Sequence, residues 1–300
     1  MSQDRNHVLS IDIGGASCRM GRVSASSKVQ DVKRVDTSKL REEGPEFLIE
    51  QLRPYVEEYA IDGIAMAIPA TVDWDHNHVR SDCEEVEWLA DSSNKKKIQD
   101  ALKRPLLLVN DVEALLVGEW LRGELKGMSS GVVISLGESM GSAMLWGSQP
   151  QQGRRGSIME LEHVSLNTHG EDDGETPPGS AHHWLSGQGL RKQLDQKGEL
   201  VNMEEFFQSD DDAHREIRNE FVNKLSHLLG TVVMMLDPER IVLGGGLTRS
   251  HKQWYPEVKE TMDDYIMEQF SGLPSVTFGQ LRENDVLIGP AAFWDWKQEE

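Results

Sequence analysis

The chain has 300 residues, 38% of them hydrophobic and 27% charged, as is typical of a soluble globular protein with one large domain or two medium ones. Its 51 acidic residues outnumber the 31 basic ones, and the net charge of −20 disfavours nucleic acid and anionic lipid as partners. Because there are only two cysteines, Cys18 and Cys83, and no apolar run as long as a membrane span, we expect a reduced, cytoplasmic protein.

The first part of the chain alternates predicted strands and helices. Val8–Ile13 and Cys18–Val23 predict two strands joined by a tight glycine turn. Helical spacing follows over residues 45–60, where Pro45 suits the first helical position and Pro54 predicts a kink or a break. The next predicted elements are strands at 63–68 and 106–109 and a helix at 112–122. This alternation favours a mostly parallel sheet.

A second round of the same pattern begins near Gly131. A strand at 132–136, a turn at Gly137 and a strand at 142–146 repeat the beginning of the chain. The remaining predicted elements are helices at 181–194, 213–236, 254–270 and 289–297, a strand at 241–243, and a helix start at Asp210-Asp211-Asp212. The pattern predicts two α/β halves that meet near residue 120, with a ligand cleft between them.

Three glycine turns follow predicted strands. They are Asp12-Ile13-Gly14-Gly15, Gly137-Glu138-Ser139-Met140-Gly141 and Gly244-Gly245-Gly246. Successive backbone N–H groups in such a turn can bind an anion, although each turn by itself is also consistent with a plain tight turn. None matches the P-loop or dinucleotide-binding spacing, so neither assignment is supported. Three such turns in one chain favour a nucleotide site.

Asp111 is the candidate general base. It follows the predicted strand 106–109, at the end from which catalytic groups of α/β sheets project. Phosphoryl transfer to an alcohol needs a carboxylate that accepts the hydroxyl proton, and the neighbouring Asn110 can donate to a sugar hydroxyl. The alternative is that Asp111 only caps the following helix.

Five segments together resemble the ROK family of sugar kinases and sugar-responsive repressors, within the actin/hexokinase-like ATPase superfamily. They are Asp12-Ile13-Gly14-Gly15, Asn110-Asp111-Val112-Glu113-Ala114 with Gly118-Glu119, Glu160-Leu161-Glu162-His163, Leu185-Ser186-Gly187 and Val242-Leu243-Gly244-Gly245-Gly246. The resemblance runs from about Val8 to about Trp294, and the stretch from Asn110 to Glu119 is its most specific part.

The resemblance implies an α/β fold of two actin-like ATPase (ribonuclease H-like) domains with a cleft between them. We expect an N-terminal domain of residues 1–120, joined by the C-terminal helix 289–300, and a C-terminal domain of residues 121–288. Family members also make a symmetric homodimer the expected assembly.

The resemblance also implies a glucokinase-like activity: ATP-dependent, Mg²⁺-assisted phosphorylation of a hexose or N-acetylhexosamine hydroxyl, with Asp111 as general base. The implied sugar-binding residues are Asn110, Asp111, Glu160, His163 and His182. The implied nucleotide-binding residues are Asp12, Gly14, Gly15, Gly137, Ser139, Gly141, Gly244 and Gly245, with Asp12 also placed near Mg²⁺.

The sugar side departs from the family pattern at several positions. Met159 and Glu162 replace the two glycines of the family's G-E-I-G-H segment, and His182 replaces a sugar-contacting Glu. The family's cysteine-rich zinc loop is absent, because residues 167–180 contain no cysteine, so no zinc site is expected. These changes leave the identity of the sugar open.

The nucleotide side departs as well. Glu138 stands in the second phosphate turn, where a carboxylate facing phosphates costs about 1–4 kcal/mol unless Mg²⁺ or a basic group intervenes. Ala16 replaces a threonine that could contact phosphate. These two residues support an alternative function, a catalytically silent sugar-binding or regulatory protein with weak or no ATP binding. A repressor is disfavoured, because no helix-turn-helix segment precedes Val8.

Overall fold

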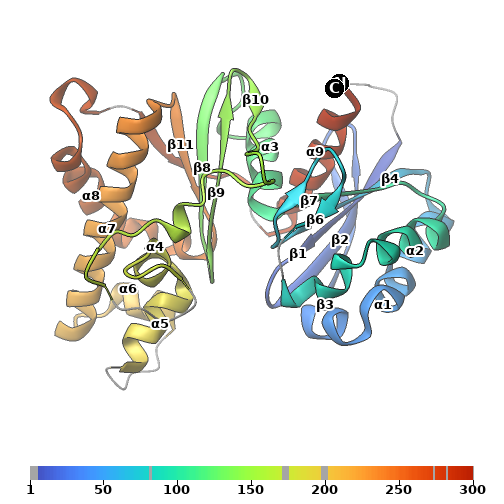
Figure 1. Cartoon of the computed structure of the whole chain (residues 1–300), viewed down its shortest axis with the longest axis horizontal. Helices are drawn as coiled ribbons and strands as arrows, with labels where there is room; N and C mark the ends of the chain where they lie inside the picture. Colours follow the sequence, from blue (N-terminus) through green and yellow to red (C-terminus); the bar gives the residue numbers. More distant parts are fainter. Residues whose placement is uncertain are drawn as a thin grey trace. The chain divides into compact units, whose positions relative to one another are not determined.

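The computed structural model describes residues 6–80, 83–170, 176–196, 202–272, 274–281 and 283–299. The chain divides into two compact units, each of which contains its own sheet and helices (Figure 1). Unit 1 comprises the chain up to Gly127, Pro150–Ile158 and the chain from Gly279 onward, and unit 2 comprises Met128–Gln149 and Met159–Phe278. The chain therefore passes from one unit to the other four times.

Unit 1 contains a five-stranded sheet in the order β3-β2-β1-β4-β7. Its strands are β1 (His7–Ile13), β2 (Ser17–Ser24), β3 (Val29–Asp36), β4 (Ile61–Ile68) and β7 (Leu106–Asn110), and a separate short ribbon pairs β5 (Val72–Asp73) with β6 (His78–Val79). β1, β4 and β7 are parallel, whereas β1, β2 and β3 are antiparallel. The sheet is thus mixed rather than mostly parallel. The β1–β2 hairpin and the polar edge strand β3, for which the sequence contains no apolar run, contribute two antiparallel pairs beside the two parallel ones.

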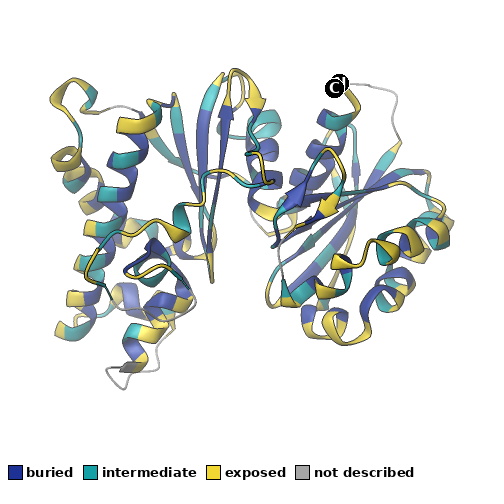
Figure 2. Cartoon of the chain, in the orientation of Figure 1, coloured by how far each residue is buried: buried dark blue, intermediate teal, exposed yellow. Residues whose placement is uncertain are grey.

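Helices cover both faces of this sheet, as the near-continuous burial of its central strands β1 and β4 requires. On one face, Leu9 and Ile11 of β1 and Met66 of β4 pack in the same core as α1 (Thr37–Glu58) and α2 (Ser92–Leu102). On the other face, Ala65 and Ala67 of β4 pack against α9 (Ile288–Glu299), which also contacts α3 (Asp111–Arg122). Figure 2 shows the central strands β1 and β4 as largely buried.

α1 is interrupted at Gly44 and not at Pro54. Gly44 has φ +65° and ψ −145°, which divides α1 just before Pro45, whereas the helix continues through Pro54. Residues 50 and 54 are both exposed, so the Glu50 carbonyl that loses its partner at Pro54 can hydrogen-bond to water. The helix therefore does not break at Pro54, and the break lies where glycine permits a positive φ.

Unit 2 also contains a five-stranded sheet, in the order β10-β9-β8-β11-β12. Its strands are β8 (Ser130–Leu136), β9 (Met140–Trp146), β10 (Gln149–Pro150), β11 (Arg240–Gly244) and β12 (Ser275–Phe278). β8 is antiparallel to β9 and parallel to β11, so the predicted repetition of the strand–turn–strand pattern is confirmed.

The helices of unit 2 share one hydrophobic core with the sheet. They are α4 (Ala181–Leu185), α5 (Gly187–Gln196), α6 (Met203–Gln208), α7 (Asp212–Leu236) and α8 (His251–Met262). Asp211 caps α7 by accepting hydrogen bonds from the N–H groups of Ala213 and His214, as its place in the acidic run predicted. Helix 181–194 is in fact two helices, because Ser186 adopts an extended backbone between α4 and α5.

The expected domains, residues 1–120 with the C-terminal helix 289–300 and residues 121–288, stay a prediction, and the two units divide the chain at other residues. Residues 150–158 belong to unit 1, where the Gln152 amide donates to the Val72 carbonyl at 2.6 Å. Residues from 279 onward also belong to unit 1, where the Leu281 N–H donates to the Glu119 carboxylate at 3.0 Å. Such contacts join residues far apart in sequence, so local patterns do not reveal them. Across the described ranges, no helix combines the length and apolarity needed to cross a bilayer.

Candidate functional site

In unit 1, the candidate residues lie at the carboxyl ends of the parallel strands. Asp12 of β1 is in register with Ala67 of β4, which is in turn in register with Val109 of β7. Asn110 and Asp111 follow Val109 directly. Adjacent strands are about 4.8 Å apart, so these residues share one edge of the sheet with Asp12 at a separation of about 10 Å.

Asn110, and not Asp111, is the N-cap of α3. The Asn110 Oδ1 accepts hydrogen bonds from the N–H groups of Val112 at 3.0 Å and Glu113 at 3.2 Å, and its Nδ2 donates to the Ala70 carbonyl at 3.2 Å. Asp111 is the exposed first residue of the helix, and its Oδ1 also accepts from the Val112 N–H at 2.9 Å. Because Asn110 supplies the cap, capping alone does not explain an aspartate at position 111.

Asp12 and its glycine turn form the other half of this edge. The Asp12 side chain is only 18% exposed and pairs with Arg19 at 3.2 Å. Burial raises the pKa of Asp12 above its usual range, although the charge of Arg19 and its hydrogen bond oppose the shift. Gly15 and Ala16 are exposed. Mg²⁺ in phosphate sites takes one or two carboxylates and fills its other positions with phosphate oxygens and water, and a partly exposed Asp12 fits that pattern.

In unit 2, the turn between β8 and β9 is held against the start of α5. The Gly137 carbonyl accepts from the Gly187 N–H at 2.7 Å, and the Glu138 carbonyl accepts from the Gln188 N–H at 3.0 Å. The Glu138 carboxylate forms a two-point ion pair with Arg191 of α5, in which Nη2 lies 2.9 Å from Oε1. A basic group therefore offsets the carboxylate that the sequence placed in this turn, and the sequence contained no sign of that partner.

The third glycine turn follows β11, the parallel neighbour of β8. Gly244 pairs with Ser135 of β8 in the register of the two strands. Gly245 has φ +85°, and a Cβ atom there would lie 2.3 Å from the Leu136 carbonyl oxygen. Only glycine fits this position, so the turn brings its backbone to the edge formed by the end of β8.

Glu162 contacts two of the remaining candidates of unit 2, Ser139 and His182. Its Oε1 accepts from the Met140 N–H at 2.9 Å and from the Ser139 hydroxyl, and lies 2.6 Å from the Nδ1 of His182. Burial alone would raise the pKa of Glu162, but the hydrogen bonds from His182, Ser139 and Met140 outweigh it and hold the pKa below its usual value. Two departures from the family pattern, Glu162 and His182, are thus partners.

Glu160 and His163 lie on either side of this residue. Both are exposed, at the two ends of the 3₁₀ turn Leu161–His163. Gly141 belongs to β9, in register with Ser135 of β8. The structure therefore brings together Ser139, Glu162 and His182 by direct contact, and places Glu160 and His163 next to them in the chain.

Glu113 belongs to the site region of unit 1 although sequence reasoning did not single it out. It is 6% exposed, and its carboxylate accepts hydrogen bonds from the indole N–H of Trp74 at 2.8 Å and from the Gln152 amide at 3.4 Å. An acidic residue in the first turn of a helix is commonly explained by a favourable interaction with the helix dipole. The sequence position therefore gave no reason to expect that Glu113 is buried. A glutamate between Val112 and Ala114 was the only available signal.

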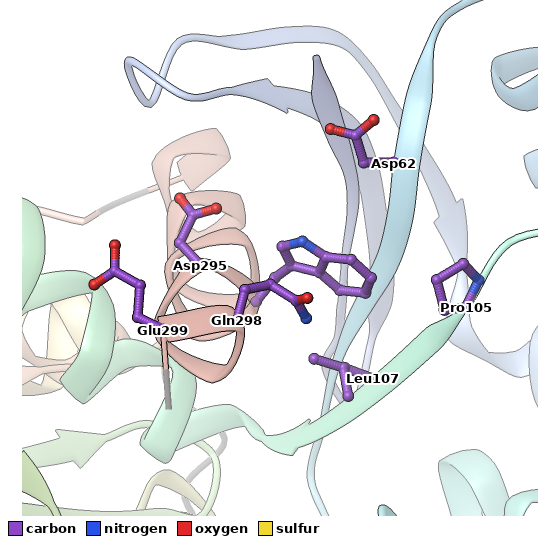
Figure 3. A pocket seen from close by; sticks show the side chains of 7 residues that line it. Asp62, Pro105, Leu107, Asp295, Gln298 and Glu299 are labelled. Atoms are coloured by element: carbon purple, nitrogen blue, oxygen red, sulfur yellow. The ribbon is translucent and has the colours of Figure 1, made fainter. Parts of the chain in front are cut away.

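One pocket of unit 1 lies away from these residues. It has a volume of ≈540 Å³ and is lined by Asp62, Pro105, Leu107, Trp294, Asp295, Gln298 and Glu299 (Figure 3). Asp62 is near the amino end of β4, and Pro105 precedes β7. Ligands of α/β sheets bind at the opposite, carboxyl ends of the strands, so we assign no part of the site to this pocket.

The candidate residues divide between the units. Asp12, Gly14, Gly15, Asn110 and Asp111 share one strand edge of unit 1, and the others lie around the β8–β9 and β11 turns of unit 2. In the part of the chain that the structure describes, no three His, Cys, Asp or Glu side chains converge to hold a metal ion. Residues 171–175, within the stretch that replaces the zinc loop, lie outside the described residues.

Comparison with known proteins finds similarity to one family over nearly the whole chain. The sequence profile of the ROK family matches residues 8–297. The glucokinase of Thermotoga maritima is 24% identical over 95% of this chain and 96% of its own length, and the N-acetyl-D-glucosamine kinase of Mannheimia succiniciproducens is 24% identical over 94% and 97%. A ROK family glucokinase from Streptomyces griseus, solved with glucose and AMPPNP, superposes with a TM-score of 0.80 at 18% identity over 96% of this chain and 98% of that one. The predicted two-domain α/β fold is confirmed.

Proposed function

The chain belongs to the ROK family, and we propose that it transfers a phosphoryl group from ATP to a hydroxyl of a hexose or N-acetylhexosamine, with Asp111 as general base. Relatives named as kinases of glucose and of N-acetyl-D-glucosamine support sugar phosphorylation. The observation that carries the proposal is the exposed Asp111 carboxylate at the carboxyl end of β7, beside a helix that is already capped by Asn110.

Asp111 accepts the proton of the attacking hydroxyl. As the sugar oxygen forms its bond to the γ-phosphorus, the bond from that phosphorus to the bridging oxygen breaks, and ADP leaves with the electron pair. Asn110 has two amide N–H groups, of which one donates to Ala70, so the other can donate to a sugar hydroxyl. We expect Asn110 to orient the sugar next to the base.

Unit 2 supplies the other sugar contacts of the proposal. Glu160, His163 and His182 present a carboxylate and two imidazoles, which can bind hydroxyl groups as acceptors and donors. The Nδ1 of His182 is held by Glu162, and this leaves its Nε2 to face a ligand. We propose that the Glu162–His182 pair discriminates among sugars, because it is the part of the sugar side that departs most from the family pattern.

The three glycine turns supply the nucleotide contacts of the proposal. Backbone groups at Gly14, Gly15, Gly137, Gly141, Gly244 and Gly245, the Ser139 hydroxyl and the Asp12 carboxylate are the proposed contacts. Mg²⁺ held at Asp12 would offset the charge of the phosphates. The ion pair with Arg191 makes Glu138 compatible with phosphate binding, since the carboxylate charge has a cationic partner.

A silent sugar-binding or regulatory protein is the second candidate. It is favoured by the same turn, because Glu138 is 64% exposed at its side chain and still carries a negative charge, and by Ala16, which has no hydroxyl to offer a phosphate. Such a protein would keep the sugar contacts and lose ATP binding.

A coupled ADP-release screen across common hexoses and N-acetylhexosamines separates the two candidates. A kinase releases ADP with at least one sugar and binds ATP·Mg²⁺ in the micromolar-to-millimolar range. Sugar binding without ATP binding would establish the silent protein instead. Polyphosphate in place of ATP tests the phosphoryl donor, with formation of the sugar phosphate as the readout, because no ADP is released from that donor.

We also propose that the protein is a cytoplasmic homodimer. Both cysteines are free thiols in the structure, which suits a reducing compartment. Symmetric dimers are the commonest assembly of soluble proteins. Sedimentation velocity at micromolar concentration tests the dimer, and a single species of 33.8 kDa would exclude it.

A further inference from the structure

Glu113 is a buried carboxyl group for which the proposed chemistry has no use. Its side chain is 6% exposed, and it lies in the first turn of α3, two residues after Asp111. Glutamate is rarely buried without a specific partner, because desolvation of its charged form is costly. The burial of Glu113 therefore needs a reason other than local helix stability.

Two side chains hold this carboxyl group from outside α3. The Trp74 indole N–H donates to Oε2 at 2.8 Å, and the Gln152 amide lies 3.4 Å from Oε1. The Gln152 amide oxygen also accepts from the backbone N–H of Trp74 at 3.2 Å. Glu113, Trp74 and Gln152 thus form a closed cluster in which each member contacts the other two.

The cluster ties the start of α3 to two other parts of unit 1. Trp74 follows β5 and packs against Phe293 and Trp296 of α9, with ring centroids 5.5 and 5.3 Å away. Gln152 belongs to Pro150–Ile158, a segment of unit 1 that is continuous with unit 2 at both ends. On α3 itself, the backbone N–H of Glu113 donates to the Asn110 side chain. Movement of Glu113 would therefore disturb the residues proposed to hold the sugar.

The protonation state of the Glu113 carboxyl group matters because a change in its charge would also act on Asn110 and Asp111. Burial raises the pKa of Glu113 to about 8, and the negative charge of Asp111 adds to the rise, while the hydrogen bonds from Trp74 and Gln152 oppose it. The nearby charged groups on the surrounding elements are Asp111 on α3, Asp73 with its partners His76 and Arg80 beside Trp74, and Lys297 of α9 over the Trp74 ring. At neutral pH the group is mostly uncharged, and ionisation adds a second negative charge near the proposed base.

We propose that Glu113 is a positioning residue: through its contacts with Trp74 and Gln152 it holds the first turn of α3, and with it Asn110 and Asp111, in the geometry that binds and deprotonates the sugar. The inference rests on the proposed kinase function. It concerns a buried residue that acts through Asn110 and Asp111, so its effect is expected in the sugar-dependent steps.

Kinetics of Glu113→Ala and Glu113→Gln test the proposal, with Glu124→Gln near the other end of α3 as the matched control. Displacement of a catalytic group by about 1 Å can lower a rate on the order of 100-fold. We expect Glu113→Ala to lower kcat/KM for the sugar by about 10- to 100-fold and to leave KM for ATP within about threefold of the wild-type value. Glu113→Gln, which keeps the shape and a hydrogen-bond acceptor, should restore most of that loss.

The pH dependence gives a readout that a purely structural role would not produce. In the wild type, kcat/KM for the sugar should fall as pH rises through about 8, and in Glu113→Gln this fall should disappear, because its amide does not ionise. The indole N–H resonance of Trp74, assigned with Trp74→Phe and followed by NMR, should inflect at the same pH in the wild type only. This resonance and the sugar dissociation constant can be measured even without turnover.

The outcomes separate this inference from the kinase proposal. If the wild type binds sugar but phosphorylates none, the kinase proposal fails, and weaker sugar binding by Glu113→Ala still supports the positioning role. If the wild type is active and Glu113→Ala retains its sugar kcat/KM and pH profile, the inference is overturned while the kinase proposal stands. A wild type that neither binds nor phosphorylates a sugar overturns both.

Discussion

At the residue scale, the carboxylates of this protein differ because their surroundings differ. Asp111 is exposed at a helix start, Glu162 is half-buried and has three hydrogen-bond donors, and Glu113 is buried and has two side-chain donors. Hydrogen bonds to the ionised form lower a pKa, and desolvation raises it. The balance therefore leaves Glu162 ionised and Glu113 mostly protonated at neutral pH, while Asp111 remains accessible to a substrate.

Replacement of Asp111 tests the proposed base directly. We expect Asp111→Ala to lower kcat by about 10²- to 10⁴-fold, the usual contribution of a general base, and to leave the sugar dissociation constant within about threefold. Steady-state kinetics and calorimetric titration with the sugar measure the two effects. Asp100→Asn, an exposed aspartate of α2 paired with Lys96, is the control. Wild-type turnover in Asp111→Ala would exclude this mechanism.

Glycine at position 245 is required by backbone geometry, and its neighbour provides a matched control. Gly245→Ala places a Cβ 2.3 Å from a carbonyl oxygen at φ +85°, whereas nothing lies within 4 Å of a Cβ at Gly246. Strained backbone conformations cost about 1–3 kcal/mol each. We expect Gly245→Ala to lower the free energy of unfolding by at least that amount and Gly246→Ala to change it little. Equal denaturant midpoints for the two variants would contradict the geometry.

The lowered pKa of Glu162 predicts acid sensitivity. A carboxyl group whose pKa is depressed by folding stabilises the native state above its unfolded pKa, here near 4.5, and that stabilisation is lost as pH falls through the lower native pKa. The stability difference between wild type and Glu162→Gln should therefore be fully present well above pH 4.5 and shrink as pH falls below 4.5. Urea unfolding at several pH values measures it, with the exposed Glu160→Gln as control. A difference that is constant with pH would argue against a lowered pKa for Glu162.

At the element scale, the β8–β9 turn and α5 act together. Backbone hydrogen bonds join them at Gly137 and Glu138, and the Glu138–Arg191 pair adds a contact between side chains that are 64% and 44% exposed. Exposed ion pairs contribute little to stability because water screens them. The more consequential effect of Arg191 is electrostatic, since it offsets a carboxylate in the turn where we propose that phosphate binds.

This arrangement predicts opposite effects for the two partners. Arg191→Ala should weaken ATP·Mg²⁺ binding by about fivefold, which corresponds to ~1 kcal/mol for an exposed charge, and Glu138→Gln should leave binding equal or tighter. Fluorescence titration with a labelled ATP analogue at low salt measures both. Arg215→Ala, which removes the exposed pair with Asp212 on α7, is the control. If both variants bind ATP as the wild type does, the β8–β9 turn does not contact the phosphates.

At the scale of the whole molecule, the net charge and the chain connectivity are the features that bear on folding and stability. The net charge of −20 implies self-repulsion in the compact state, and the four passages of the chain between units make the folding of each unit depend on distant segments. Unit 1 in particular is completed by residues 150–158 and 279–299, which come after all five strands of its sheet in the chain. A fragment that ends near residue 127 would lack these segments, including the α9 helix that covers one face.

The charge predicts stabilisation by salt. Repulsion among carboxylates is screened as the Debye length falls from about 30 Å at 0.01 M to about 3 Å at 1 M salt. We therefore expect the melting temperature to rise when NaCl is increased from 0.01 to about 0.5 M. Differential scanning calorimetry measures the rise. A melting temperature that falls with salt would mean that attractive ion pairs outweigh the net repulsion.

Local patterns in the sequence were sufficient for most of the fold. Apolar runs and helical spacing identify the central strands and main helices, because burial of one face imposes a period on the chain. The same patterns locate Asp111 after a buried strand and the three glycine turns after theirs. They fail for the polar edge strand β3, whose residues are mostly exposed, and at Pro54, where exposure allows the helix to continue.

Contacts between distant residues could be decided only by the tertiary structure. Arg191 is 53 residues from Glu138, His182 is 20 from Glu162, and Gln152 is 39 from Glu113. A charge in a sequence has no defined environment, and the pKa of a carboxyl group depends on burial and partners that arise only when the chain folds. The sequence by itself therefore determined the family, the central strands, the main helices and the candidate base. The folded structure decided which charges are neutralised, which are buried and where the chain crosses between its units.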